Sequence, residues 1–267
     1  MHPIERLRYV ARSSGVPARS LVSETAMALQ SFRHDQQALV TACRRVVSRQ
    51  PTSGALVWFA ARVLTAADPS AEIYQASGEV EADPTAAELA HLLPDDACAV
   101  VLGWPDEIGE ALPRRGDVRV LVVDVASEAY GLVSRLERCD VQASEVAAQG
   151  LGASVLDADV VLLEASAVGP DACLAVAGSR AAAATARHAG VPVWLVAGVG
   201  RLLPGAMWDP FLAGALPPVA PWEADDEVVP LDLIDVVVGP WGKLSVADAL
   251  RRTDCPVAPE LFRGNVF

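Results

Sequence analysis

Apolar residues in the N-terminal part of the chain recur at steps of three and four positions. They are Leu21, Ala26, Leu29 and Phe32, followed by Leu39, Ala42, Val46 and Val47. This spacing places them on one face of a helix and predicts amphipathic helices. Ser23-Glu24 offers a start for the first of these helices, and His34-Asp35 separates it from the second. After a break at 51–54, a further helix is expected over 55–64.

The pattern changes after residues 67–84, a segment with two prolines and several acidic residues. We interpret it as a connection between domains. The sequence therefore predicts a helical N-terminal domain over 1–67 and a second domain over 68–267.

Short apolar runs alternate with helical segments in the second domain. Strands are predicted at 97–102, 118–124, 159–163 and 191–196, and helices at 106–112, 128–138 and 173–189. Continuous apolar runs of this length are typical of strands buried on both faces, and helices between them allow parallel pairing. The fold class is thus α/β, with a Rossmann-like, doubly wound, mostly parallel sheet behind the helical N-terminal domain. Beyond Pro204 we expect an irregular segment at 208–227 and an edge strand at 233–238.

Composition and charge narrow the classes of protein. Hydrophobic residues make up 52% of the chain and charged residues 21%, as in globular proteins. A net charge of -13 disfavours nucleic-acid binding, although Arg44, Arg45 and Arg49 form a local basic group, interpreted as a solvated face. The charged N-terminus and the lack of a long apolar run predict a cytoplasmic protein without a membrane partner.

The cysteines and histidines predict neither a disulfide framework nor a metal site. The five cysteines are scattered without a Cys-x-x-Cys pair, and the four histidines lack the spacing of metal ligands. We expect no metal and no cofactor.

Candidate chemistry lies where predicted strands end, because sheets of this kind bind ligands beyond the carboxyl ends of their strands. Asp124 and Glu164 end two strands and could transfer a proton or bind a sugar hydroxyl; capping or solvated acids are equally compatible readings. Gly198-Val199-Gly200 is interpreted as a turn rather than a dinucleotide motif, because no helix pattern follows it correctly. Cys173 falls at a predicted helix start, where a reactive thiolate is one reading and a buried core cysteine the favoured one.

The order of several segments resembles one superfamily. It joins the alpha, beta and delta subunits of eukaryotic initiation factor 2B to the methylthioribose-1-phosphate and ribose-1,5-bisphosphate isomerases. The resemblance covers roughly residues 35–242. It is carried by Ser48–Ser53, the strand Val120–Asp124 leading to Gly131, Asp159–Ser166, Gly178-Ser179 before an alanine-rich helix, Gly190–Trp194 and Pro230–Asp235.

The resemblance implies a sugar-phosphate site whose catalytic groups are replaced here. The isomerases use a loop cysteine and the aspartate of a Gly-Ala-Asp stretch to move protons between sugar carbons. This chain has Glu164-Ala165-Ser166 at that stretch and Gly103-Trp104-Pro105-Asp106, without a thiol, at the loop. Val176 and Ala126 stand where the family has a lysine and an arginine. Losing both a base and an acid should abolish an enediol mechanism.

Carried over position by position, the resemblance gives two sets of candidate residues. The candidate catalytic positions are Asp124, Glu164 and Ser166. The candidate ligand-binding positions are Arg49, Thr52, Ser53, Trp104, Gly131, Gly178 and Ser179.

Three functions follow as hypotheses. The first is an initiation factor 2B-like protein that is catalytically degenerate and binds a small phosphorylated metabolite, either a sugar phosphate or a nucleotide, or a partner. The alternative is an aldose-ketose isomerase acting on a ribose phosphate, with Asp124 or Glu164 moving the proton. A regulator of a translation factor is the third, disfavoured by a composition rich in alanine, valine and arginine and poor in lysine. Because family members associate through their C-terminal domains, we expect a homodimer with residues 231–238 at the contact.

Overall fold

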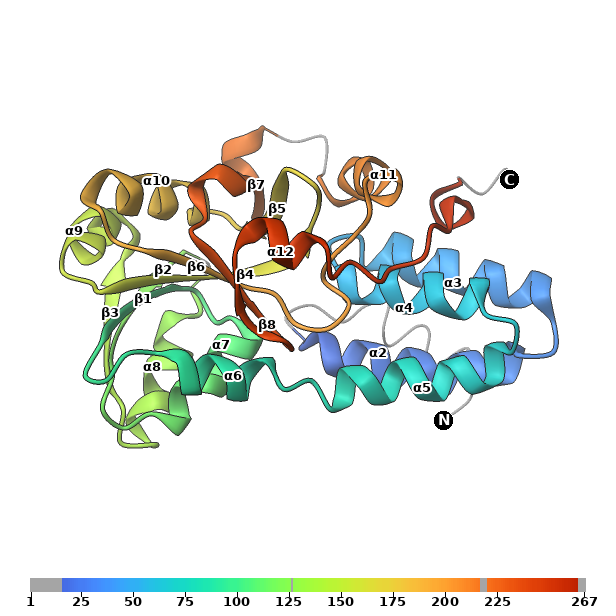
Figure 1. Cartoon of the computed structure of the whole chain (residues 1–267), viewed down its shortest axis with the longest axis horizontal. Coiled ribbons are helices and arrows are strands. Elements are labelled where there is room, and N and C mark those ends of the chain that lie inside the picture. The colour runs from blue at the N-terminus through green and yellow to red at the C-terminus, as the bar shows by residue number, and fades with distance from the viewer. Residues whose placement is uncertain (1–15, 126, 217–219, 264–267) are drawn as a thin grey trace.

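The computed structural model describes residues 16–125, 127–216 and 220–263 of the 267-residue chain. A bundle of helices lies beside an α/β unit built on one large sheet (Figure 1). No helix within these ranges is both long and apolar enough to cross a membrane.

The helical bundle forms around α4, whose residues are almost all buried. Its helices are α2 (Ala18–Leu29), α3 (Gln36–Arg49), α4 (Gly54–Thr65) and α5 (Pro69–Glu81), with a 3-10 turn η1 (Gln30–Phe32) after α2. The side chain of Asp35 accepts a hydrogen bond from the N–H of Ala38 and caps α3, which confirms the predicted helix boundary. The predicted start at Ser23 was wrong, because α2 begins at Ala18 after Pro17.

Residues 67–84, predicted to be a connection, are mostly helix. Asp68 caps α5 through the N–H groups of Ser70 and Ala71, and the helix packs on α2 and α4. The few buried residues of α5, among them Ile73 and Val80, are separated by polar residues. The spacing of apolar residues that is typical of a helix was therefore not evident in the sequence. The prediction of a connection was therefore wrong, whereas the division of the chain at residue 67 stays a prediction.

The main sheet confirms the predicted α/β, mostly parallel fold. Its order is β3-β2-β1-β4-β6-β8-β9, and all pairs are parallel except β8 with β9. The strands are β1 (Cys98–Leu102), β2 (Arg119–Asp124), β3 (Gln142–Ala147), β4 (Val160–Val168), β6 (Val193–Val196), β8 (Val236–Gly239) and β9 (Gly242–Leu244). The chain runs outward from β1 to β3 and then returns to β4 on the other side of β1. The strand order thus reverses between β1 and β4, where such sheets bind ligands.

Helices cover both faces of the sheet (Figure 1). One face carries α6 (Thr85–Leu92), α7 (Asp106–Ala111) and α8 (Ala129–Glu137). The other carries α9 (Leu151–Leu156), α10 (Ser179–Ala189) and α12 (Val246–Leu250). Two separate hydrophobic clusters result, one on each face, so the central strands are buried on both sides as their apolar runs predicted.

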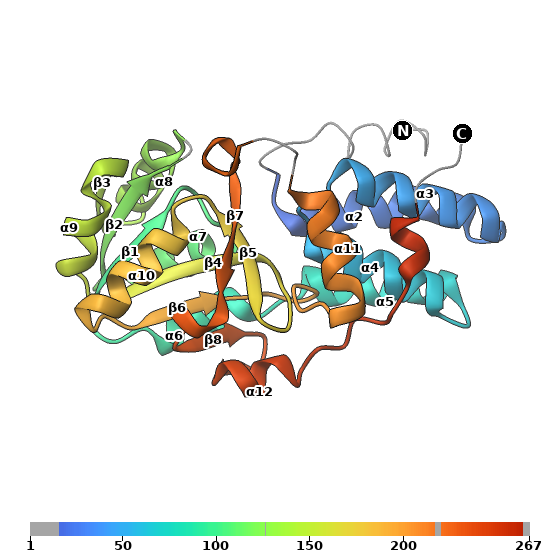
Figure 2. The ribbon, with the colours of Figure 1, turned by 90° about the horizontal axis from the view of Figure 1, so that it is seen from above.

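A second, antiparallel layer of strands was not predicted. After its parallel part, β4 pairs with β5 (Ala172–Val176), and β5 pairs with β7 (Asp226–Pro230). These strands lie between the main sheet and the helical bundle (Figure 2). The predicted helix over 173–189 was therefore wrong in its first part, because Cys173 belongs to β5. The predicted irregular segment 208–227 was wrong in part, since α11 (Gly205–Ala215) occupies its beginning and β7 starts at Asp226, near its end.

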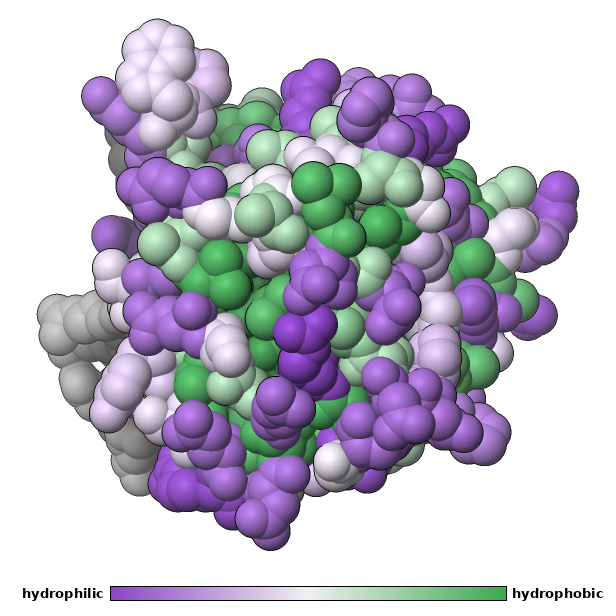
Figure 3. Space-filling model, turned by 90° about the vertical axis from the view of Figure 1, so that its left-hand side faces the viewer, coloured by the Kyte–Doolittle hydropathy of each residue, from purple (hydrophilic) through white to green (hydrophobic). Residues whose placement is uncertain are grey.

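The sheet edges also differ from the predictions. β8 was predicted to be an edge strand, but β9 pairs with it and forms that edge. At the other edge, β3 has four of its six residues exposed, so it lacks the apolar signal that revealed the central strands. On this side of the molecule, hydrophilic side chains interrupt the apolar patches (Figure 3).

The helical bundle meets the sheet at a glycine. A Cβ atom on Gly54, the first residue of α4, would lie 2.7 Å from the carbonyl oxygen of Ser166 and 2.8 Å from the Cβ of Ala167. Only glycine allows α4 to approach β4 this closely.

We predict that Gly54→Ala lowers the free energy of unfolding by about 1–3 kcal/mol, because the added methyl group forces the helix away from β4. Equilibrium urea unfolding measures this change. Gly78→Ala is the matched control: no atom lies within 4 Å of its added Cβ, so helix propensity should stabilise that variant by about 0.5–1 kcal/mol. Equal stability of the two variants would contradict the close packing at Gly54.

Candidate ligand-binding site

A cavity of about 500 Å³ opens beside the point where the strand order reverses. Residues from both bodies of the molecule surround it. Its main polar and aromatic lining residues are Trp104, Asp106, Glu110, Glu128, Arg135, Glu164, Ser166, Ser179, Arg201 and Asp226. Val16 and Pro17, just before α2, complete the wall from the helical bundle. The predicted position of the site at the carboxyl ends of the strands thus coincides with a real cavity.

Trp104 forms an aromatic wall of this cavity and is 40% exposed. It follows β1 and packs over α8, where a Cβ atom on Gly131 would lie 2.5 Å from the indole ring. Gly131 itself is absent from the cavity lining. Its contact is with Trp104, so the lack of a side chain at Gly131 makes room for the ring.

Glu164 lies at the base of the cavity with its side chain only 10% exposed. Its Oε1 accepts a hydrogen bond of 3.2 Å from the N–H of Asp106, and its Oε2 accepts bonds of 2.8 and 3.1 Å from the N–H groups of Glu107 and Ile108. These donors are the first three residues of α7. Glu164 therefore caps a helix from a distant strand, satisfying N–H groups that have no partner within the helix.

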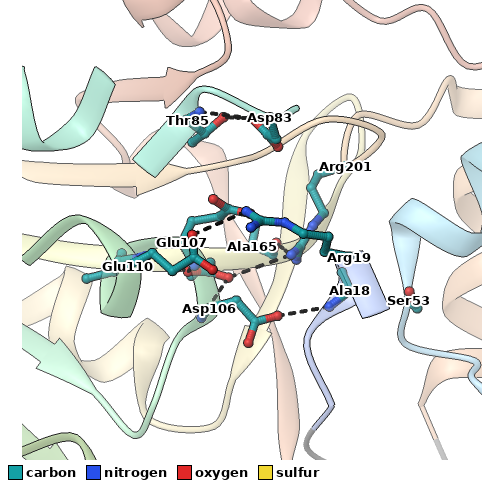
Figure 4. Close-up of polar contacts among 12 residues, drawn as sticks. Ala18, Arg19, Ser53, Asp83, Thr85, Asp106, Glu107, Glu110, Ala165 and Arg201 are labelled. Atoms are coloured by element: carbon teal, nitrogen blue, oxygen red, sulfur yellow. Dashed lines mark hydrogen bonds and ion pairs between the residues drawn. The ribbon is translucent and has the colours of Figure 1, made fainter. Parts of the chain in front are cut away.

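Arg201 closes the same cluster from the loop after β6. Its Nη2 lies 3.7 Å from Oε1 of Glu164, and its Nη1 donates to the carbonyl oxygen of Ala165 at 2.7 Å (Figure 4). Burial raises the pKa of Glu164 to about 7, and this effect outweighs the opposing influence of Arg201 and the helix N–H groups. The carboxylate is thus held by hydrogen bonds within the fold, although its residue lines the cavity.

A second buried carboxyl group, Glu107, lies beside this cluster (Figure 4) and is not among the residues that line the cavity. Burial, together with the nearby charges of Asp83 and Glu164, raises its pKa to about 8. Asp83 is fixed by the N–H and hydroxyl of Thr85 and by the N–H of Val199. Two like charges close to a buried carboxyl favour its protonated form.

The helical bundle is joined to this cluster through the start of α2. Oδ2 of Asp106 accepts a hydrogen bond of 3.1 Å from the N–H of Ala18, and Arg19 pairs with Glu110 at 3.2 Å (Figure 4). These contacts place one wall of the cavity on the bundle and the other on the sheet.

The structure brings four of the predicted site residues to the cavity: Trp104, Glu164, Ser166 and Ser179. Their predicted roles in catalysis or binding stay predictions. The hydroxyl oxygen of Ser179 is buried and has no hydrogen-bond partner among the described residues.

The other predicted residues lie outside the cavity lining. Asp124 ends β2 and accepts a hydrogen bond of 3.4 Å from the N–H of Ala129, at the start of α8. Ser53 caps α4, and Thr52 precedes it. Arg49 is exposed at the end of α3. Gly178 adopts a left-handed conformation, with φ of 98°, before α10. Ala126, at the family's arginine position, is outside the described residues.

Sequence reasoning missed six charged residues of the cavity lining: Asp106, Glu110, Glu128, Arg135, Arg201 and Asp226. Of these, Arg135 lies on α8, Arg201 follows the glycines interpreted as a turn, and Asp226 begins β7 in the segment predicted to be irregular. Burial raises the pKa of Asp226 to about 6, with a further contribution from Asp225. The amphipathic period of residues 128–138 was the available signal for Arg135; for Asp226 no local signal existed.

The cysteines do not supply a thiol to this site. None of the five lines the cavity, and burial raises the pKa of Cys173 to about 12. The favoured reading of Cys173 as a buried core cysteine is confirmed. Within the described ranges, no group of three or more histidine, cysteine, aspartate or glutamate side chains is placed to hold a metal ion.

Several solved structures have a fold similar to that of this chain. No protein-family model matches the sequence, and no curated protein matches it. Among solved structures, the translation initiation factor eIF-2B of Pyrococcus horikoshii OT3 is similar over 93% of this chain and 98% of its own, with a TM-score of 0.77 and 13% identity. The eIF2B beta subunit of Chaetomium thermophilum covers 97% of this chain and 91% of its own, with a TM-score of 0.73 and 16% identity.

An enzyme shares the same fold. The 5-methylthioribose 1-phosphate isomerase of Pyrococcus horikoshii OT3 has a TM-score of 0.63 and 13% identity, covering 92% of this chain and 85% of its own. The resemblance inferred from the sequence is thus confirmed at the level of fold, to both the initiation factor subunits and the isomerase.

We predict that Glu164→Leu destabilises the protein by about 2–4 kcal/mol at pH 8, because an apolar side chain leaves the buried Arg201 without its partner and three N–H groups of α7 without an acceptor. Urea unfolding measures the loss. The control Glu110→Leu removes a carboxylate from a more exposed pair with Arg19, so its effect should stay within about 1 kcal/mol. Equal effects of the two substitutions would show that Glu164 does not hold the junction.

The raised pKa of Glu107 predicts lower stability at higher pH. Between pH 6 and 8 an unfolded glutamate is ionised, whereas the folded protein keeps a proton on Glu107, so stability falls as pH rises toward about 8. We expect this group to contribute about 2 kcal/mol to the difference in unfolding free energy between pH 6 and 8. Glu107→Gln should remove that contribution, and Glu145→Gln, on the exposed strand β3, should not. A pH dependence unchanged by Glu107→Gln would refute the assignment.

Proposed function

We propose that this protein binds a small phosphorylated metabolite of the sugar-phosphate class in the cavity beside β1 and β4, and does not isomerise it. The cavity volume of about 500 Å³ suits a ligand of that size. The observation that carries the proposal is the lining: an aromatic wall at Trp104, hydroxyls at Ser166 and Ser179, and a cation at Arg135 with no partner among the described residues.

Arg135 is the group that favours an anionic ligand. The other guanidinium of the cavity, Arg201, is buried and already engaged with Glu164 and Ala165. Arg135 is half-buried on α8 and makes no ion pair within the described ranges, so its five donors are available to a phosphoryl group. A planar guanidinium binds phosphate oxygens in pairs, which gives orientation as well as affinity.

The commitment of Glu164 to the helix cap supports binding without conversion. Proton transfer between sugar carbons needs a base and an acid that reach the substrate. Both oxygens of Glu164 are occupied by N–H groups of α7, Ser166 has no carboxyl group, and Asp124 lies outside the cavity lining. The absence of a thiol among the described lining residues supports the same reading. These contacts favour binding over the alternative of an aldose-ketose isomerase, in which Asp124 or Glu164 would move the proton.

A homodimer remains part of the proposal, although its contact needs revision. One neighbour in fold is a tetrameric eIF2B-beta2-delta2 complex from C. thermophilum, with a TM-score of 0.74 and 17% identity over 93% of this chain and 92% of its own. Residues 231–238, expected at the contact, lie largely inside this chain, because Leu231, Ile234, Val237 and Val238 are buried in its own core.

We expect ribose 5-phosphate to raise the melting temperature of the protein in phosphate-free buffer, because a ligand bound only by the folded state stabilises it. A panel of other sugar phosphates and nucleoside monophosphates ranks the ligand class. Arg135→Ala should weaken binding at least about tenfold by calorimetry. Arg138→Ala, three residues away and exposed, is the matched control and should bind as the unmodified protein does.

Two outcomes would overturn the proposal. One is the failure of every phosphorylated compound in the panel to bind. The other is turnover of ribose 1,5-bisphosphate, 5-methylthioribose 1-phosphate or ribose 1-phosphate that disappears in Ser166→Ala, since this would place catalysis at the cavity.

A further inference from the structure

The antiparallel strand β7 delivers a carboxyl group to the cavity from a part of the chain remote from the rest of the site. Asp226 is paired with Val176 of β5, and both residues line the cavity. Ala175, the residue before Val176 on β5, is paired with Ala165 of β4. Both alanines are buried in the hydrophobic core, on the side of these strands that faces away from the cavity. Because side chains alternate along strands, Glu164, Val176 and Asp226 face the same side across β4, β5 and β7.

Asp226 differs from the other acids of the cavity in having no partner within the described ranges. Asp106 accepts the N–H of Ala18, Glu110 binds Arg19, and Glu164 caps α7. Glu128 is exposed at the rim. Asp226 is half-buried, and burial raises its pKa to about 6. An acceptor this enclosed, without a donor, is costly unless water or a ligand supplies one.

Glu227, the next residue of β7, is a carboxylate with a structural role. Glu227 points to the other side of β7 and accepts a hydrogen bond of 2.9 Å from the N–H of Arg180, at the start of α10. This bond fixes β7 against α10. Asp226 has no such function, so the fold does not account for its burial.

Ser179 gives a second, independent sign of a polar ligand at the same place. Its residue is 1% exposed, its hydroxyl lacks a partner among the described residues, and it lines the cavity. It directly precedes Arg180, whose N–H joins α10 to β7. A free acceptor and a free hydroxyl therefore lie on neighbouring elements of one cavity wall, and buried polar groups of this kind are normally satisfied.

We infer that Asp226 recognises adjacent hydroxyl groups of the ligand, accepting a hydrogen bond from each of two neighbouring hydroxyls while Ser179 bonds to the same end of the molecule. The inference rests on the proposed function, because it assigns the sugar end of the ligand whose phosphoryl end binds Arg135. An ionised carboxylate is an acceptor with two oxygens, which fits a pair of adjacent hydroxyls. A sugar lacking one hydroxyl leaves an acceptor unpaired and is rejected on that account.

Calorimetry at pH 8, where Asp226 is ionised, tests this role with ribose 5-phosphate and 2-deoxyribose 5-phosphate. The unmodified protein should bind ribose 5-phosphate about tenfold to a hundredfold more tightly than the deoxy sugar. In Asp226→Asn the ribose affinity should fall and the preference should nearly vanish. Asp225→Asn removes the same charge from the exposed neighbouring residue and should keep the preference. Affinity for inorganic phosphate should be the same in all three proteins.

The outcomes separate this inference from the proposed function. Equal affinity of the unmodified protein for the two sugars, or an unchanged preference in Asp226→Asn, overturns the role of Asp226 and leaves phosphorylated-ligand binding intact. Failure of both sugars and of inorganic phosphate to bind the unmodified protein overturns both. Asp226→Asn should melt no lower than the unmodified protein at pH 8, because asparagine removes a buried charge; the comparison of sugars on the unmodified protein does not depend on that variant.

Discussion

Three backbone N–H groups and one guanidinium converge on the carboxylate of Glu164, at the point where β4 leaves the parallel sheet. Unpaired N–H groups at a helix start and an unpaired arginine are both costly when buried, so one carboxylate satisfies two requirements at once. This cluster fixes α7 and the loop after β6 against β4. Asp106, within the capped turn, then binds the start of α2 and joins the helical bundle to the sheet.

The same constraint limits the chemistry that the cavity can perform. A base must be free to approach a substrate proton, whereas Glu164 is surrounded by donors that belong to the fold. Its pKa near 7 reflects burial and does not by itself indicate catalysis, since structural carboxyl groups are shifted by the same physical effect. Similarity of fold to an isomerase therefore does not by itself assign that chemistry to this cavity.

The cavity is lined both by the main parallel sheet with its helices and by the antiparallel strands β5 and β7. Trp104 follows β1, beside the point where the strand order reverses, as expected for a doubly wound sheet, and Arg135 lies on α8, after β2. Asp226 comes from the antiparallel layer of β5 and β7, which lies between the sheet and the helical bundle (Figure 2). The ends of the site thus belong to different layers: a cation on α8 and an acceptor on β7. This arrangement matches a ligand with one anionic end and one hydroxyl-bearing end.

The sequence by itself determined the parallel core of the protein and the edge of the sheet where the cavity lies. The buried runs that became β1, β2, β4 and β6 were evident because strands covered on both faces must be apolar throughout. The end of β4 and the loop after β1 followed from the same pattern, and the candidates chosen there, Glu164 and Trp104, both line the cavity. Tertiary structure alone decided the strands β3, β5 and β7 and the helix α5, because their residues are polar, alanine-rich or only partly buried. It also decided that Glu164 caps a helix and that Asp226 reaches the cavity, since both depend on contacts between segments roughly fifty or more residues apart, which no local pattern records.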